Sequence, residues 1–208
     1  PANQAISVHP EHDYSVVATE KGNLLLAHDL VETALTELKL DSQGILVTVS
    51  GKELEGLRAQ HPLIADRQVP IILGDHVTTD SGTGLVHTAP GHGLDDYIVG
   101  LKYNLPVENP VGGNGVYLES AAVFAGEHIY KANPKIIAAL HDNGHLVNHT
   151  KIEHSYPHCW RHKSPIIFRA TPQWFINMEK EGLRERALKD IPDVKWTPAW
   201  GQNRIESM

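Results

Sequence analysis

The sequence predicts a mainly β protein with peripheral α-helices. Short runs rich in valine, isoleucine and leucine recur along the chain and are separated by turn sequences, which is typical of strands. Helical spacing of apolar residues occurs in only four stretches. Strands and helices do not alternate strictly, which disfavours a doubly wound parallel sheet.

The first half of the chain holds most of the predicted strands. Lys21-Gly22 and Ser81-Gly82 are turn sequences, and each is flanked by two predicted strands that we expect to pair as a hairpin. Pro70, near the start of another run, indicates an edge strand because proline cannot donate a ladder hydrogen bond. The predicted strands are residues 14–18, 23–27, 45–49, 69–73, 76–80 and 83–88.

Four helices are predicted, and capping residues support two of them. Asp29 and Asn133 are expected N-caps, and Pro134 suits the first turn of the helix that follows it. Gly144 can adopt the left-handed conformation that ends a helix. Residues 145–154 then alternate in polarity and predict a strand. The predicted helices are residues 30–39, 94–103, 135–141 and about 178–190.

Length and composition fit a soluble globular protein. The chain has 208 residues, of which 41% are hydrophobic and 21% charged, so it can bury a sizeable core. It has no run of 18 apolar residues, and its single cysteine, Cys159, suits a reducing cytoplasm. No signal peptide or initiator methionine precedes Pro1, and we expect a piece of a longer polypeptide.

The net charge of −7 is unevenly distributed. Residues 1–150 carry 8 Lys/Arg against 18 Asp/Glu, a balance of −10, whereas residues 151–190 carry 8 against 5, or +3. The acidic part argues against nonspecific binding of nucleic acid. Contact with RNA would therefore use the basic later segment or other parts of a longer chain.

Residues 82–103 are the best candidate for a functional site. An apolar run ends in His87, a Gly/Pro loop with His92 follows, and Asp95 and Asp96 open a helix. This order brings polar groups, a loop that a ligand can approach closely and a helix N-terminus into one space. The histidines can donate, accept or move a proton near pH 7.

The two acids could serve either of two roles. In the first turn of a helix a carboxylate gains roughly 0.3–1 kcal/mol from the helix dipole, and this alone can explain Asp96. Alternatively, it binds a cation such as an amino acid's α-ammonium, an attraction of about 4 kcal/mol at about 4 Å before desolvation. The spacing leaves both roles open, and Asp95 is the alternative residue for each.

Other common site chemistries find no support in the sequence. The phosphate-binding patterns G-x-G-x-x-G and G-x-x-x-x-G-K-[S/T] are absent, and so is the nucleophile motif G-x-S-x-G. Histidines recur every four or five residues from His141 to His162, with Cys159-x-x-His162 at the end of the run. Zinc sites usually take four ligands from paired spacings such as C-x-x-C, and this chain has a single cysteine. We therefore expect no metal site.

Four motifs together resemble the editing domain inserted into isoleucyl-tRNA synthetases. They are G-T-G-L-V-H-T-A-P-G-H-G-L-D-D-Y, P-V-G-G-N-G-V-Y, H-S-Y-P-H-C-W-R-H-K-S-P-I-I-F-R-A-T-P-Q-W-F and W-G-Q-N-R-I-E-S-M. The resemblance covers nearly the whole chain. The valyl and leucyl relatives share G-T-G, the proline and the later acid, but typically carry lysine and methionine, respectively, at the position of His87.

The resemblance implies a β-barrel-like editing domain in residues 1–153 and, in residues 154–208, a segment that returns to a catalytic domain. It implies hydrolysis of the ester of valine wrongly attached to tRNA(Ile). Asp96 would hold the α-ammonium of the substrate, and His87 would lie near the amino acid and the terminal ribose. The other residues of the pocket would be Thr83, Ala89, Gly91, His92 and Gly93.

The resemblance also sets expectations for cofactors and partners. The fragment needs no cofactor, whereas the parent synthetase uses ATP and Mg²⁺. The expected partners are the 3′ end of tRNA(Ile) bearing valine and the rest of the synthetase chain, in a cytoplasmic monomer. The synthetase signatures H-I-G-H and K-M-S-K-S are absent, so this piece cannot attach an amino acid to tRNA. A threonine-rich strand that forms another pocket wall is expected just upstream of Pro1.

Two alternative functions stay open at this point. The chain could be a noncatalytic module that docks tRNA or spaces other domains, with Asp96 serving only the start of a helix. It could also be a valyl-type editing domain that acts on Thr-tRNA(Val). Histidine at position 87 disfavours this second alternative.

Overall fold

A computed structural model describes residues 1–207, and of Ala122 the backbone only. The chain divides into two compact units, Pro1–Ala170 and Thr171–Met208. The functional boundary expected between residues 153 and 154 falls inside the first unit and stays a prediction. None of the helices in the described part is long and apolar enough to cross a membrane.

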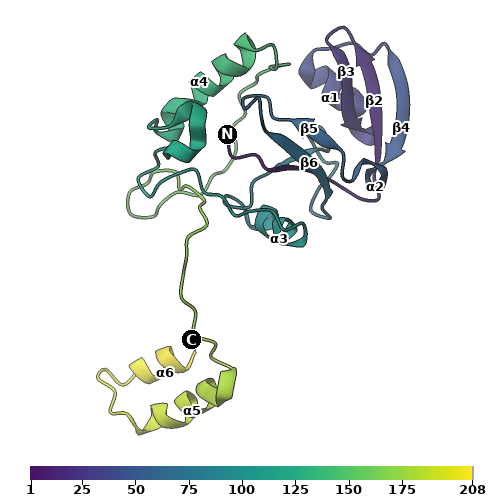
Figure 1. Ribbon diagram of the computed structural model, residues 1–208. Helices are drawn as coiled ribbons and strands as arrows, with labels where there is room; N and C mark the ends of the chain where they lie inside the picture. Colours follow the sequence, from purple (N-terminus) through teal and green to yellow (C-terminus); the bar gives the residue numbers. More distant parts are fainter. Residues whose placement is uncertain (208) are drawn as a thin grey trace. The chain divides into compact units, whose positions relative to one another are not determined.

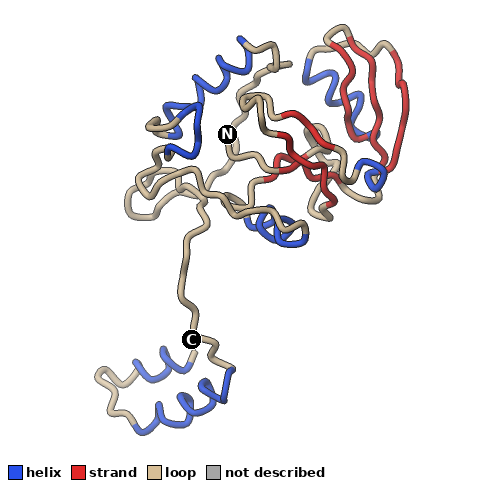
Figure 2. The backbone as a smooth tube through the Cα atoms, in the orientation of Figure 1, coloured by secondary structure: helices blue, strands red, loops and turns tan. Residues whose placement is uncertain are grey.

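The first unit contains two separate β-sheets (Figures 1 and 2). One has the strand order β5-β6-β1-β7, in which β1 runs parallel to β6 and antiparallel to β7. The other has the order β3-β2-β4 and is antiparallel throughout. The strands are β1 (Ala5–Val8), β2 (Asp13–Thr19), β3 (Gly22–Ala27), β4 (Gly44–Ser50), β5 (Arg58–Gln60), β6 (Gln68–Leu73) and β7 (Val86–Thr88).

Helices lie around these sheets in the first unit and supply the regular structure of the second (Figure 2). Those of the first unit are η1 (His28–Leu30), α1 (Val31–Leu38), α2 (Gly51–Leu54), α3 (Leu94–Lys102), η2 (Glu119–Phe124) and α4 (Ile129–Asp142), where η marks a 3-10 helix. Those of the second unit are η3 (Lys180–Gly182), α5 (Leu183–Asp190), η4 (Ile191–Asp193) and α6 (Gly201–Glu206).

The expectation of a mainly β, barrel-like domain needs correction. Helix makes up 31% of the chain and strand 20%, and no closed barrel forms within the described residues. The sheets stay open because their outer strands are not joined to each other: β5 and β7 end one sheet, and β3 and β4 end the other. The architecture is therefore two small open sheets with helices.

Two predicted strands are loops in the structure. Residues 76–80 follow a turn closed by the Val77 N–H, which donates to the Gly74 carbonyl at 3.2 Å. Residues 145–154 begin with backbone groups that bond elsewhere: the Leu146 N–H donates to the end of α4, and Lys21 Nζ donates to the Val147 carbonyl at 3.1 Å. These local and side-chain hydrogen bonds take the place of the strand pairing that was expected for the two segments.

Two predicted helix starts are also wrong. Asp29 lies inside η1 and caps no helix with its side chain. Helix α4 begins at Ile129 rather than at residue 135, because His128 Nδ1 accepts the N–H of Tyr130 and so serves as the N-cap. Pro134 therefore lies in the helix interior rather than in its first turn.

Helix α3 forms where helical spacing predicts it, and it is anchored by a narrow buried face. Val99 packs with Ala5 of β1 and Ile72 of β6. A Cβ at Gly100 would lie 2.6 Å from Pro90 Cγ, so the helix approaches the preceding loop closely. These contacts hold the C-terminal half of α3 against the sheet and against the loop that follows β7. Other apolar residues of the helix are exposed, including Leu94, Ile98 and Leu101.

Tyr14 of β2 fixes the chain just before β7. Its side chain is fully buried, and its hydroxyl accepts the N–H of His9 at 2.8 Å and donates to the Gly84 carbonyl at 2.9 Å. Gly84 has a φ of +73°, and a Cβ there would lie 2.3 Å from Ala27 Cβ. The G-T-G turn thus packs directly against the end of β3 and directs the chain into β7.

Candidate functional site

The site begins at β7, which brings His87 to the exposed face of the four-stranded sheet. Successive residues of a strand face opposite sides. Thr88 is buried, and its hydroxyl lies 2.7 Å from that of Ser7 on the neighbouring strand. His87 pairs with Ile6 and is exposed. The strand therefore presents the imidazole to solvent at the point where the loop starts.

The loop from Ala89 to Gly93 turns tightly between β7 and α3. The His92 N–H donates to the Ala89 carbonyl at 2.9 Å and closes the turn. A Cβ at Gly91 would lie 2.1 Å from the carbonyl oxygen of Glu108, so only glycine fits at this close approach. The backbone of the loop is consequently pressed against a second segment of the chain.

Asp95 and Asp96 share the first turn of α3 but have different surroundings. Asp96 Oδ2 accepts the N–H of Ala89 at 2.9 Å, so its side chain folds back over the loop instead of capping its own helix. A Cβ at Gly93 would lie 3.1 Å from Asp96 Cγ, which shows how closely the two approach. Asp95 is exposed and lines a separate cavity of about 120 Å³ together with His76.

His87 is favoured in its neutral form by its surroundings. Desolvation lowers the pKa of His87, and the Asp96 carboxylate opposes this effect by favouring the charged form. The residue is nevertheless exposed to solvent. A neutral imidazole that is coupled to a carboxylate and open to solvent can orient a water molecule or a hydroxyl group.

His92 and Thr83 lie at the edges of this arrangement. His92 Nδ1–H donates to the Phe168 carbonyl at 2.9 Å, and its Nε2 is buried with no hydrogen-bond partner among the described residues. The Thr83 carbonyl accepts the N–H of Ala27 at 2.9 Å, which ties Thr83 to the end of β3. Of the predicted site residues, those that lie in the loop after β7 or in the first turn of α3 are Ala89, Gly91, His92, Gly93 and Asp96.

Among the described residues, the later histidines bond separately and not to one another. His145 Nδ1–H donates to the Pro62 carbonyl at 2.9 Å. Cys159 Sγ and His162 Nδ1 lie 3.3 Å apart and form a pair. Within residues 1–207, no three His, Cys, Asp or Glu side chains are grouped as metal ligands.

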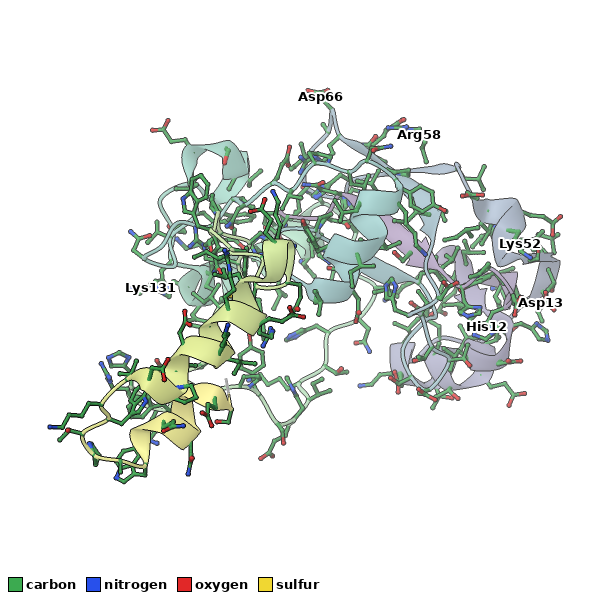
Figure 3. All side chains as sticks on the ribbon, turned by 90° about the horizontal axis from the view of Figure 1, so that it is seen from below. His12, Asp13, Lys52, Arg58, Asp66 and Lys131 are labelled. Carbon is green, nitrogen blue, oxygen red and sulfur yellow. The ribbon has the colours of Figure 1, made fainter. Side chains whose placement is uncertain are left out.

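His61, which the sequence patterns did not single out, is electrostatically coupled to His87. It is only 3% exposed, whereas Asp66 of the same loop projects outward (Figure 3). His61 Nδ1 accepts the N–H groups of Leu63 and Ile64, both at 3.1 Å. Burial first, and then nearby positive charges, lower the pKa of His61 to about 4. A His-Pro dipeptide in a polar loop carries no sequence signal for such burial.

The lowered pKa of His61 predicts that the protein loses stability in mild acid. An unfolded histidine binds its proton near pH 6.5, whereas the folded one resists protonation down to about pH 4. The contribution is therefore fully present above pH 6.5 and lost as the pH falls toward 4, because the unfolded state binds more protons in that window. Urea unfolding at a series of pH values measures the effect.

The matched variant for this measurement is His61→Asn, whose Oδ1 can accept the same two N–H groups without titrating. The difference between wild type and variant in unfolding free energy should depend on pH between 6.5 and 4. A difference that stays constant across this range would show that His61 titrates normally in the fold.

Comparison with known proteins places these features in a family. Residues 14–208 match the family model described as tRNA synthetases class I (I, L, M and V). The chain is 85% identical over its full length to an isoleucine–tRNA ligase of Psychrobacter arcticus and 62% identical to that of Acinetobacter baylyi. It spans 22% of the length of each of these relatives.

A solved structure shares the fold. The crystal structure of GlLeuRS-CP1 matches 73% of this chain and 80% of its own, with a TM-score of 0.56 and 16% sequence identity. This likeness extends to the arrangement of two small sheets and helices. With the family model matching nearly all of its length, the chain belongs to the class I tRNA synthetases of the isoleucine, leucine, methionine and valine group.

Proposed function

We propose that this chain is the editing module of an isoleucyl-type synthetase and hydrolyses the ester of valine wrongly attached to tRNA(Ile). The observation that carries the proposal is the Asp96 carboxylate, which accepts the Ala89 N–H and so lies over the loop from Ala89 to Gly93, with His87 exposed at the start of the same loop. The isoleucine–tRNA ligase relatives support the choice of tRNA(Ile). The site motif itself resembles the editing pocket of that group.

In the proposed mechanism Asp96 binds the α-ammonium of valine. One carboxylate oxygen accepts the Ala89 N–H, which leaves the other oxygen for the ammonium and fixes its direction. A fixed ammonium sets the position of the ester carbonyl, which water then attacks. His87 orients the water or the terminal ribose. Backbone N–H groups or a ribose hydroxyl stabilise the oxyanion.

Binding selectivity alone cannot separate isoleucine from valine well enough, and editing supplies the additional selectivity. A pocket separates amino acids that differ by one methylene by only about 1–3 kcal/mol, and a second pocket that admits the smaller one raises the selectivity. Isoleucine and valine are the standard illustration of this limit. Here the proposed pocket wall formed by Ala89, Gly91 and Gly93 is lined by small residues.

The remaining features of the proposal concern the whole protein. The module itself uses no cofactor, and ATP and Mg²⁺ serve the parent synthetase. Its partners are the valine-bearing 3′ end of tRNA(Ile) and the rest of the synthetase chain, in a cytoplasmic monomer. Residues 1–153 would form the editing part and residues 154–208 the connection to the catalytic domain. The facing pocket wall would come from the threonine-rich strand upstream.

One observation favours a noncatalytic alternative. Asp96 Oδ2 already accepts the Ala89 N–H, so the carboxylate has a structural role in holding the loop. The chain could then serve as a tRNA-docking or spacer module. In that case the loop has only a structural role and binds no aminoacyl ester.

The test is a deacylation assay with the full-length enzyme that contains this chain. We expect Val-tRNA(Ile) to be hydrolysed roughly 10–200 times faster than Ile-tRNA(Ile), the range that one methylene can supply. Thr-tRNA(Val) is the second substrate. Faster hydrolysis of Thr-tRNA(Val) would identify a valyl-type site, and no hydrolysis of either ester would favour the spacer.

A further inference from the structure

A short segment at the end of the first unit is hydrogen-bonded to the site loop. The Ala170 N–H donates to the Gly91 carbonyl at 2.7 Å, and the Phe168 carbonyl accepts His92 Nδ1–H at 2.9 Å. Residues 168–170 have no helix or strand of their own. The bonds to Gly91 and His92 therefore join two irregular segments that are far apart in the sequence.

The same segment is anchored on its other side by two side chains. Arg169 Nε donates to the Val111 carbonyl at 2.7 Å. Asn109 Nδ2 donates to the Ala170 carbonyl, also at 2.7 Å. Residues 168–170 thus lie between the site loop and residues 109–111: Phe168 bonds to the loop, Arg169 to residues 109–111, and Ala170 to both.

The position of Asp96 depends on this arrangement through the loop. Asp96 holds the Ala89 end of the loop, and residues 168–170 hold Gly91 and His92. Glu108 closes the third side, because its carbonyl leaves no room for a Cβ at Gly91. A shift of residues 168–170 would pull on Gly91 and His92 and so move the Ala89 N–H relative to Asp96.

We infer that Arg169 and Asn109 are positioning residues of the candidate site, acting through Gly91 and His92 and touching no substrate. The inference rests on the proposed editing function. A misplacement of about 1 Å can cost roughly 100-fold in rate without weakening binding. Removing either anchor is therefore expected to lower the rate of deacylation and to leave the binding of tRNA nearly unchanged.

The experiment compares Arg169→Ala, Arg169→Lys and Asn109→Ala in the full-length enzyme that contains this chain. The kcat and KM of Val-tRNA(Ile) deacylation are measured, together with the rate of isoleucine attachment to tRNA. The matched control is Arg161→Ala, since Arg161 is exposed in the same stretch and packs over the Trp160 ring at 5.0 Å. Thermal unfolding identifies any variant that fails to fold.

Arg169→Ala should lower kcat roughly 10- to 100-fold, with KM within about twofold and isoleucine attachment unchanged. Arg169→Lys keeps a donor on a long side chain and should recover part of the loss. Asn109→Ala should also lower kcat. It provides the test if Arg169→Ala does not fold. Deacylation equal to that of Arg161→Ala, or a proportional loss of both activities, would overturn the inference.

The two proposals fail in different ways. If Asp96→Ala leaves deacylation intact, the editing site itself is misassigned. If Asp96→Ala removes deacylation while Arg169→Ala and Asn109→Ala retain full kcat, the site stands and only the positioning role is refuted.

Discussion

We expect the replacement of Asp96 with alanine in the full-length enzyme to abolish the proposed hydrolysis of Val-tRNA(Ile) and to leave activation of isoleucine intact. The substitution removes the charge that holds the α-ammonium, an attraction of about 4 kcal/mol before desolvation. Each loss of about 1.4 kcal/mol in the transition state is tenfold in rate, so deacylation should fall at least about 100-fold. Single-turnover deacylation and pyrophosphate exchange measure the two activities.

Two further variants separate the charge of Asp96 from its role in the loop. Asp96→Asn keeps an oxygen that can accept the Ala89 N–H but carries no charge, so it should be nearly as inactive as alanine. Asp95→Ala removes the neighbouring acid, which lines a different cavity, and should deacylate like wild type. Near-normal activity of Asp96→Asn would mean that the carboxylate only holds the loop.

Tyr14→Phe is expected to have the largest effect on stability. The hydroxyl of Tyr14 is buried and bonds the His9 N–H and the Gly84 carbonyl, so phenylalanine leaves both groups without their partner. A buried unsatisfied polar group costs about 1–3 kcal/mol, and the two together should lower the unfolding free energy by about 2–4 kcal/mol. Urea denaturation monitored by circular dichroism gives this value.

The control for this prediction is Tyr130→Phe. Tyr130 is 46% exposed, and its hydroxyl donates to the Pro165 carbonyl at 3.3 Å, where water can replace it. This variant should change the unfolding free energy by less than about 0.5 kcal/mol. Equal effects of the two substitutions would mean that the bonds of Tyr14 do not stabilise the junction between β3 and β7.

Turn residues, β-branched content and helical spacing correctly predicted several elements of the fold. The hairpin of β2 and β3 forms around Lys21-Gly22, and β4 and α3 lie close to where β-branched content and helical spacing place them. The grouping of the site residues was also local, because His87 and Asp96 are nine positions apart across one loop. These features could be expected from the sequence because the patterns that indicate them lie within short stretches of it.

The elements that were missed depend on distant partners. Residues 145–154 alternate in polarity like a strand, but Lys21 and the end of α4 take their first backbone groups. The short strand β1 is stabilised by pairing with β6 and β7, which its own four residues do not reveal. The burial of His61 and the bonds of residues 168–170 to the site loop are likewise long-range, so no window of sequence contains them.

For redesign of substrate choice, the loop offers few usable positions. A methyl group at Gly91 would overlap the Glu108 carbonyl, and one at Gly93 would press on Asp96. A protein engineer therefore cannot narrow this pocket by the usual exchange of glycine for alanine. His87 is the more accessible position for variation, because it is exposed to solvent.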